Sequence, residues 1–180
     1  YVSDEDFAVW AYSRDVSPFY PTITPGIIVR PGTAEEVVEI IKLANETRAP
    51  VVPRGGGASS FGSPFVCLSK ELHKKAIVAD LTRMNEVIDI NEANMMVTAQ
   101  CGITLSELST RVKKRGFRVH GVIMPLYTAT LGGVLSGMTC GGVDTEWPTE
   151  GGGGRYVVGL KVVLPDGSIV HTGGGPGTNR

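Results

Sequence analysis

The spacing of apolar residues predicts two helices. One apolar face is formed at helical spacing by Val37, Ile40, Ile41 and Ala44. A second face of the same kind is formed by Leu105, Leu108 and Val112. Each face follows a capping box, T-A-E-E from Thr33 or T-L-S-E from Thr104, in which the threonine hydroxyl accepts from a backbone N–H three residues on. Gly116 is expected to end the second helix.

Short runs of β-branched and other apolar residues predict the strands. They cover residues 27–30, 51–52, 76–81, 87–90 and 96–100. Two further runs flank the turn P-D-G-S and predict a hairpin over 157–172. The order of strand, helix, strand and glycine-rich loop near the start of the chain is typical of an α/β phosphate binder.

That glycine-rich loop belongs to the run V-V-P-R-G-G-G-A-S-S, residues 51–60. Three consecutive glycines bury no side chain, and they add conformational entropy to the unfolded state. Their backbone can turn sharply and direct several N–H groups at one place, which suits a phosphate. Ser59 and Ser60 add hydroxyl donors. The run therefore predicts a phosphate or pyrophosphate site.

Glycine is also abundant later in the chain. Of the 24 glycines among 180 residues, 15 lie between residues 132 and 177. Residues 124–154 show little apolar periodicity, so we expect a long, mostly irregular segment there, of a kind that is uncommon unless functional. Glycine clusters separated by recognisable elements predict several loops that approach one extended ligand.

Charge and cysteine content narrow the setting. The net charge is −1 and the basic residues are not gathered in one stretch, which argues against a nucleic-acid partner. Three cysteines without C-x-x-C spacing, Cys67, Cys101 and Cys140, favour reduced thiols and an intracellular setting. We expect a cytoplasmic location, and peripheral attachment to the inner membrane is the alternative. The three histidines lie far apart in the sequence, so no metal site is predicted.

Two common kinds of glycine-rich phosphate site do not match the residues around this loop. A P-loop needs Lys followed by Ser or Thr after its last glycine, and this chain has no such pair. A dinucleotide-binding Rossmann loop must open a helix, which Gly62 and Pro64 would break. Pro53 also argues against a central parallel strand before the loop.

The motifs taken in order resemble one family. They are V-V-P-R-G-G-G-A-S-S, A-D-L-T-R-M-N-E-V, Q-C-G-I-T-L-S-E-L, P-L-Y-T-A-T-L-G-G and V-V-G-L-K-V-V-L-P-D-G. Over about residues 25–172 the chain resembles the FAD-binding domain of the vanillyl-alcohol oxidase and p-cresol methylhydroxylase superfamily, in its glycolate oxidase and D-lactate dehydrogenase branch. The resemblance implies an α+β, PCMH-type domain at 25–180 after an extension at 1–24. In that fold FAD lies between a small strand–helix–strand unit and a larger mixed or antiparallel sheet.

The resemblance also implies the FAD contacts. The pyrophosphate would be wrapped by Arg54, Gly55, Gly56, Gly57, Ala58, Ser59 and Ser60. The flavin and ribityl chain would lie beside Pro125, Thr130, Leu131, Gly132, Gly133 and Gly137. Further along the same path come Gly141 and Gly151, and then Val157, which matches a residue whose backbone meets the adenine. The alternatives are a surface salt bridge for Arg54, a turn cap for Ser59 and Ser60, and helix packing for Gly132 and Gly133.

The chain departs from the family pattern at two places. Members whose flavin is bonded to a histidine of the first loop carry that histidine where this chain has Ala58. Covalent attachment there is excluded, so we expect noncovalent FAD. W-P-T-E, residues 147–150, replaces the R-Y-G-like string that relatives often carry before the last glycine cluster.

The resemblance implies an oxidoreductase that transfers a hydride from a small 2-hydroxy acid to FAD. In the family, the base and the carboxylate-binding groups come mostly from a separate cap domain, so no catalytic residue is assigned here. The reduced flavin would pass electrons to an electron-transfer flavoprotein, a quinone or oxygen. Two alternatives stay open: a non-catalytic FAD-carrying subunit of a larger complex, and a site for another nucleotide or a sugar phosphate.

Overall fold

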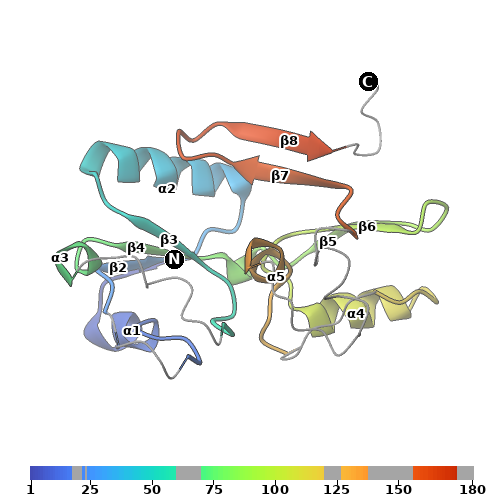
Figure 1. The fold of residues 1–180 in the computed structure, drawn as a ribbon, viewed down its shortest axis with the longest axis horizontal. Helices are drawn as coiled ribbons and strands as arrows, with labels where there is room; N and C mark the ends of the chain where they lie inside the picture. Colours follow the sequence, from blue (N-terminus) through green and yellow to red (C-terminus); the bar gives the residue numbers. More distant parts are fainter. Residues whose placement is uncertain (18–21, 23, 60–69, 120–126, 138–155, 174–180) are drawn as a thin grey trace.

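The computed structural model describes residues 1–17, 22, 24–59, 70–119, 127–137 and 156–173. Figure 1 shows a four-stranded sheet with a helix on each face, a two-stranded sheet with a helix beneath it, and a hairpin that spans the top. The predicted α+β class is confirmed. Within the described residues the antiparallel part comprises two separate two-stranded sheets instead of one larger sheet.

The four-stranded sheet has the order β1-β2-β4-β3. β2 (Ile27–Val29), β4 (Ile77–Asp80) and β3 (Val51–Arg54) run parallel, and β1 (Val2–Ser3) pairs antiparallel with β2. Ile28 and Val78 pair across the middle of the sheet and are both fully buried. β3 is an edge strand, which is where a strand containing Pro53 is tolerated.

α1 (Asp6–Ala11) and α2 (Ala34–Thr47) cover opposite faces of this sheet (Figure 1), and α3 (Lys70–His73) precedes β4. Val9 of α1 is buried against the strand residues, so residues before 25 contribute both an edge strand and part of the core. The predicted cap of α2 forms, with Thr33 Oγ1 accepting from Glu36 N at 3.2 Å. The Glu36 carboxylate accepts from Gly32 N at 2.7 Å, which also stabilises the start of the helix.

The second unit follows a 3₁₀ turn, η1 (Leu81–Arg83). It consists of antiparallel β5 (Val87–Asn91) and β6 (Met96–Ala99), with α4 (Leu105–Lys113) packed on them. The predicted inward face of α4 is buried, Thr104 caps the helix, and Gly116 follows it with φ of +82°. The expectation of a mostly irregular segment at 124–154 is wrong for α5 (Leu131–Gly137), because Val134 and its neighbours bury a short helix against α4.

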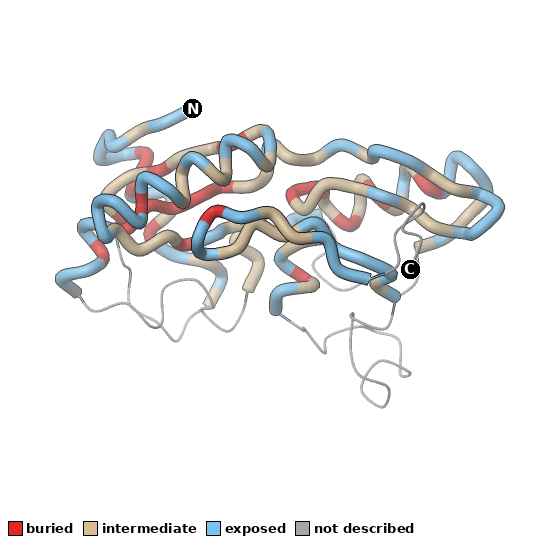
Figure 2. The backbone as a smooth tube through the Cα atoms, turned by 90° about the horizontal axis from the view of Figure 1, so that it is seen from above, coloured by how far each residue is buried: buried red, intermediate tan, exposed pale blue. Residues whose placement is uncertain are grey.

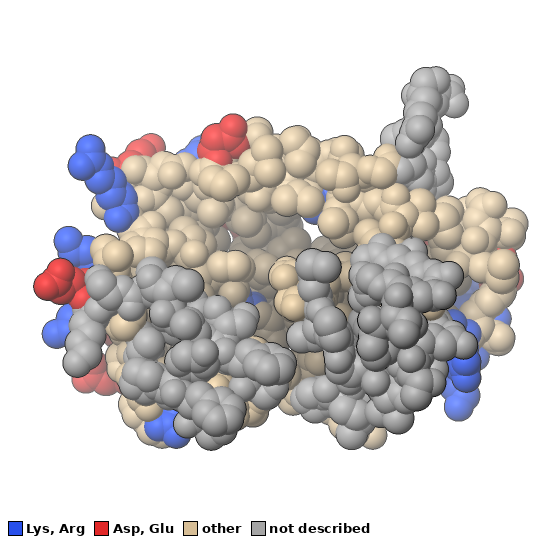
Figure 3. Space-filling view, in the orientation of Figure 1, with Lys and Arg blue, Asp and Glu red and all other residues tan. Residues whose placement is uncertain are grey.

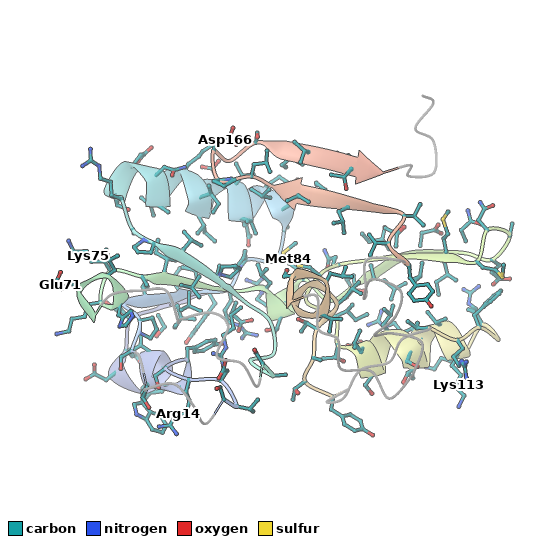
Figure 4. The ribbon with its side chains drawn as sticks, in the orientation of Figure 1. Arg14, Glu71, Lys75, Met84, Lys113 and Asp166 are labelled. Carbon is teal, nitrogen blue, oxygen red and sulfur yellow. The ribbon has the colours of Figure 1, made fainter. Side chains whose placement is uncertain are left out.

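The predicted hairpin is formed by β7 (Gly159–Val163) and β8 (Ile169–Gly173). Its turn, marked by Asp166 in Figure 4, lies against α2. Asn45 of α2 donates to the Pro165 carbonyl at 2.8 Å, and Lys161 Nζ lies 3.4 Å from the Glu35 carboxylate. Figure 2 shows buried residues concentrated in the four-stranded sheet and around α4, while the far end of the hairpin is exposed.

None of the described helices has the length and apolar character that crossing a membrane requires.

Candidate functional site

The glycine loop leaves the sheet at the carboxyl ends of its parallel strands. Arg54, the last residue of β3, pairs in register with Asp80, the last residue of β4. Gly55 therefore begins the loop beside two neighbouring strand ends. Ligands of open parallel sheets bind outside this edge.

The loop packs directly against the segment that precedes α5. A Cβ atom at Gly55 would overlap the Thr130 hydroxyl, and one at Gly56 would overlap the Thr128 carbonyl oxygen. Any side chain at either position would push the two segments apart. The structure thus brings together the first and second predicted cofactor segments, which are separated by about 70 residues of sequence.

Ala58 joins the same contact from the other end of the loop. Its methyl group packs on a cluster formed by Leu105, Ala129 and Val134. The side chain at position 58 is therefore directed toward the protein. A methyl group offers no atom through which a flavin could be bonded.

The backbone N–H groups of the loop are available to a ligand. In the part of the chain that the structure describes, residues 55–58 donate no backbone hydrogen bond. Gly57 adopts φ of +65°, a left-handed conformation that turns the loop back on itself. Several free amides in a short turn suit a phosphate group, so the residues present fit the pyrophosphate of FAD.

The second segment uses its amides within the protein. Leu131 N donates to the Ile103 carbonyl at 2.9 Å, and Gly132 N donates to the Cys101 carbonyl at 2.7 Å. Gly133 N makes a long contact of 3.4 Å with Thr130 Oγ1. These N–H groups hold α5 on the 101–103 turn, and a cofactor beside this segment would meet other atoms of it.

Gly132 has the packing role that was the alternative to a cofactor contact. A Cβ atom added at this position would lie only 2.7 Å from Cys101 Cβ. Cys101 is a free, half-buried thiol, and burial raises its pKa. The turn that carries it is also fixed from the other side, since Gly102 N donates to the carbonyl of Met84 at 2.8 Å (Figure 4 labels Met84).

The Arg54 side chain contacts the segment that follows α1. Its guanidinium lies over the Tyr12 ring, 5.1 Å from the centroid, and Nη1 donates to the Arg14 carbonyl at 3.0 Å. Burial is the main cause that lowers the pKa of Arg54. The residue therefore joins the loop to the segment after α1 and forms no surface salt bridge among the described residues.

Tyr12 and Asp80 were not identified from the sequence. The Tyr12 hydroxyl donates to Asp80 Oδ2 at 2.5 Å, and Thr82 donates to Oδ1 from its N and its Oγ1. Burial, followed by the hydrogen bond to Asp80, raises the pKa of Tyr12 to about 12. The one available signal was D-L-T, residues 80–82, whose aspartate can accept from the N–H two residues on.

Gly137 and Val157 are two further predicted FAD contacts. Within the described residues, neither forms a backbone hydrogen bond with the loop 55–58. Gly137 ends α5, and half-buried Val157 precedes β7. Four predicted contacts lie outside the described residues: Ser60, Pro125, Gly141 and Gly151. On the face drawn in Figure 3, the described Lys and Arg side chains lie apart near the edges and form no continuous basic surface.

Comparison with known proteins identifies relatives across most of the chain. A family model described as an FAD binding domain matches residues 25–173. Glycolate oxidase subunit GlcD of Bacillus subtilis is 29% identical over 163 residues, which cover 91% of this chain and 33% of the relative. D-lactate dehydrogenase of Archaeoglobus fulgidus is 32% identical over 173 residues, covering 91% of this chain and 35% of that protein. The chain thus spans about a third of the length of these curated relatives.

Solved structures share the fold. An alkyldihydroxyacetonephosphate synthase superposes with a TM-score of 0.78 and 25% identity, over 99% of this chain and 33% of that chain. 6-Hydroxy-D-nicotine oxidase from Arthrobacter nicotinovorans superposes with a TM-score of 0.73 and 21% identity, over 96% of this chain and 35% of that chain.

Proposed function

We propose, from the premise that this chain belongs to the FAD binding domain family, that its glycine loop holds the FAD pyrophosphate without a covalent bond. The resemblance inferred from the order of motifs is confirmed by the family match, and FAD is the cofactor. The observation that carries the proposal is the set of backbone N–H groups at 55–58 that have no acceptor in the described protein.

The loop and the segment before α5 have different tasks in this proposal. Residues 55–58 bind the phosphates through main-chain donors, which recognise charge and need no side chain. The segment 128–130 supports the loop, through the close contacts of Thr130 with Gly55 and of Thr128 with Gly56. The methyl group of Ala58 leaves the flavin free to dissociate.

The reaction we propose is the oxidation of a small 2-hydroxy acid. Bound FAD would supply the hydride acceptor. The relatives named glycolate oxidase subunit and D-lactate dehydrogenase support this substrate class. The proton-accepting base and the carboxylate-binding groups would come from a cap domain or partner subunit, and an electron-transfer flavoprotein, a quinone or oxygen would reoxidise the flavin. We expect the protein in the cytoplasm, where a free thiol such as Cys101 stays reduced.

The test is the visible spectrum of the intact protein. We expect a yellow protein that releases FAD into the supernatant on acid precipitation and is bleached anaerobically by glycolate or D-lactate. FAD retained in the precipitate would contradict noncovalent binding. A protein that stays colourless after FAD is supplied would contradict the assignment of the loop. A yellow protein that no hydroxy acid bleaches, but that a reduced partner does, would be an FAD-carrying electron-transfer subunit.

A further inference from the structure

The side chain of Arg54 lies between the glycine loop and the N-terminal segment. Its guanidinium stacks on the Tyr12 ring. The loop also returns to the guanidinium at Gly57, where an added Cβ atom would lie 2.8 Å from Arg54 Cζ. The guanidinium thus links the Tyr12 ring to the loop backbone, and these three groups are called the column below.

The base of this column is anchored in the sheet. The Tyr12 hydroxyl donates to Asp80, a side chain that is 5% exposed at the end of β4. Arg30 Nε lies 3.0 Å from the same carboxylate oxygen, as an ion pair whose N–H is not aligned for a hydrogen bond. Arg30 and Thr82 hold the Asp80 carboxylate in one position. The hydrogen bond from Tyr12 to this fixed carboxylate therefore holds the ring in place as well.

The hydrogen bonds of Arg54 extend the same connection. Nη1 donates to the carbonyl of Arg14 at 3.0 Å and approaches that of Tyr12 at 3.5 Å. Figure 4 shows Arg14 beyond α1, on the side of the sheet away from α2. The guanidinium is therefore held by residues 12–14, which lie before the part of the chain that the family model matches.

We propose that Tyr12 and Arg54 are positioning residues for FAD: the Tyr12 ring supports the Arg54 guanidinium, and the guanidinium fixes the turn at Gly57 that aligns the loop amides. This inference rests on the proposed assignment of residues 55–58 to the pyrophosphate. It makes cofactor affinity depend on Tyr12, a residue that acts through Arg54 and lies before the matched family region. In this arrangement the positive charge of Arg54 also attracts the anionic pyrophosphate without contacting it directly.

The experiment measures the dissociation constant of FAD from the intact protein by flavin fluorescence. The unsubstituted protein is titrated first, so a failure to bind FAD is recognised as a failure of the proposed function. Tyr12→Leu removes the ring, Tyr12→Phe keeps the ring without its hydroxyl, and Arg54→Lys keeps the charge without the planar guanidinium. Trp10→Leu is the control, since Trp10 lies on α1, the helix that Tyr12 follows, and is 65% exposed.

We expect Tyr12→Leu and Arg54→Lys each to weaken FAD binding about tenfold, because both remove the stacked contact. The double variant should bind no more weakly than the weaker single one, since both changes break one column. Tyr12→Phe should restore affinity to within about twofold while lowering the melting temperature of the apoprotein. Trp10→Leu should leave both quantities unchanged.

Normal FAD affinity in Tyr12→Leu, or effects of the two single variants that multiply, would overturn the inference. Should Tyr12→Leu fail to fold by circular dichroism, Arg54→Lys decides alone. If Arg54 contacts the phosphate directly, the lysine in Arg54→Lys can replace that contact and FAD affinity stays near normal. Near-normal affinity in Arg54→Lys would therefore refute the supporting role. Weaker FAD binding by Arg54→Lys, with an unchanged circular dichroism spectrum of the apoprotein, would support that role.

Discussion

The loop 55–58 and the segment 128–133 pack against each other, but their backbones are used differently. The loop keeps its N–H groups free of protein acceptors, whereas residues 131 and 132 donate theirs to the turn at 101–103. The loop is held in shape by contacts from both sides, at Thr128 and Thr130 and at Arg54. A binding loop can leave its donors free only if neighbouring segments hold it in place, because free donors contribute nothing to its own folding.

This comparison also distinguishes two reasons why glycine is required at these positions. Gly55, Gly56 and Gly132 are required because another part of the protein comes too close for a side chain. Gly57 is required in addition because of its positive φ. Glycine in this domain therefore reports close packing between segments as much as close approach to a ligand.

Gly56→Val should have the largest effect on cofactor binding. The valine would collide with the Thr128 carbonyl, and backbone cannot move aside as a flexible side chain can. We expect FAD affinity to fall at least about 100-fold, which corresponds to about 3 kcal/mol. Equilibrium dialysis with FAD measures this.

The control for Gly56→Val is Gly116→Ala. Gly116 has a positive φ, unlike Gly56, and has no atom within 4 Å of an added Cβ. The Gly116→Ala variant should lose about 1 kcal/mol of stability through backbone strain and should bind FAD normally. Equal FAD affinity in Gly56→Val and the unsubstituted protein would show that the loop does not depend on its contact with Thr128.

Gly132→Ala should affect stability more than FAD binding. Its methyl group would lie 2.7 Å from Cys101 Cβ, so we expect the free energy of unfolding to fall by about 1–3 kcal/mol. Because residue 132 donates to protein and not to ligand, the FAD dissociation constant should change less than fivefold, roughly 1 kcal/mol. Urea unfolding and FAD titration measure the two quantities. Cys101→Gly in the same chain should restore part of the stability, and an absence of any rescue would refute the proposed collision.

Thr104→Ala should give a smaller loss of stability. Thr104 Oγ1 accepts from Glu107 N at 3.2 Å, and Leu105 N then donates to the Ala129 carbonyl at 3.0 Å. Removing the cap should lower the free energy of unfolding by about 1 kcal/mol with unchanged FAD affinity. Thr33→Ala, at the matching cap of α2, is the comparison and should give a similar loss in urea unfolding. A clear loss of FAD affinity in Thr104→Ala alone would mean that the segment 128–133 has a closer role in binding.

The smallest expected effect is a change in pH dependence at Tyr12. Its pKa is raised from 10.0 to about 12, so the folded protein favours the neutral phenol. The stability from this preference is complete below pH 10 and is lost as the pH rises toward 12. Tyr12→Phe lacks this titration, and its urea midpoint should fall less steeply across that window. Parallel curves for the two proteins would contradict the raised pKa.

Much of the fold was predictable because the relevant signals are local. The two capping threonines, Gly116 and the P-D-G-S turn each satisfy hydrogen bonds or backbone angles within a few residues. The alternation of strands and helices followed from apolar spacing alone. α5 was missed because L-G-G-V-L-S-G has low intrinsic helix propensity, and its formation depends on burial of Val134 against Leu105 and Ala129.

The meeting of the two predicted cofactor segments could be predicted from the sequence, but the contacts within and around them could not. Motif order correctly placed the glycine loop and the segment before α5 in one region. It could not show that Arg54 turns toward Tyr12, because the two residues are 42 positions apart in the sequence and meet only in the folded structure. Likewise, the packing of Gly132 on Cys101 depends on how two turns meet in three dimensions.

The position of the hairpin on α2 has a consequence for the order of folding during synthesis. Lys161 reaches Glu35 across 126 residues of sequence, and Asn45 reaches Pro165 across 120. At typical translation rates of about 5–20 residues per second, the α2 surface is made roughly 6–25 seconds before the hairpin that covers it. The new chain therefore exposes Val38 and its neighbours to the ribosome surface and to chaperones during that interval. The hairpin is the element that ends this exposure, so translation pauses upstream of residue 159 should increase chaperone binding to the nascent chain.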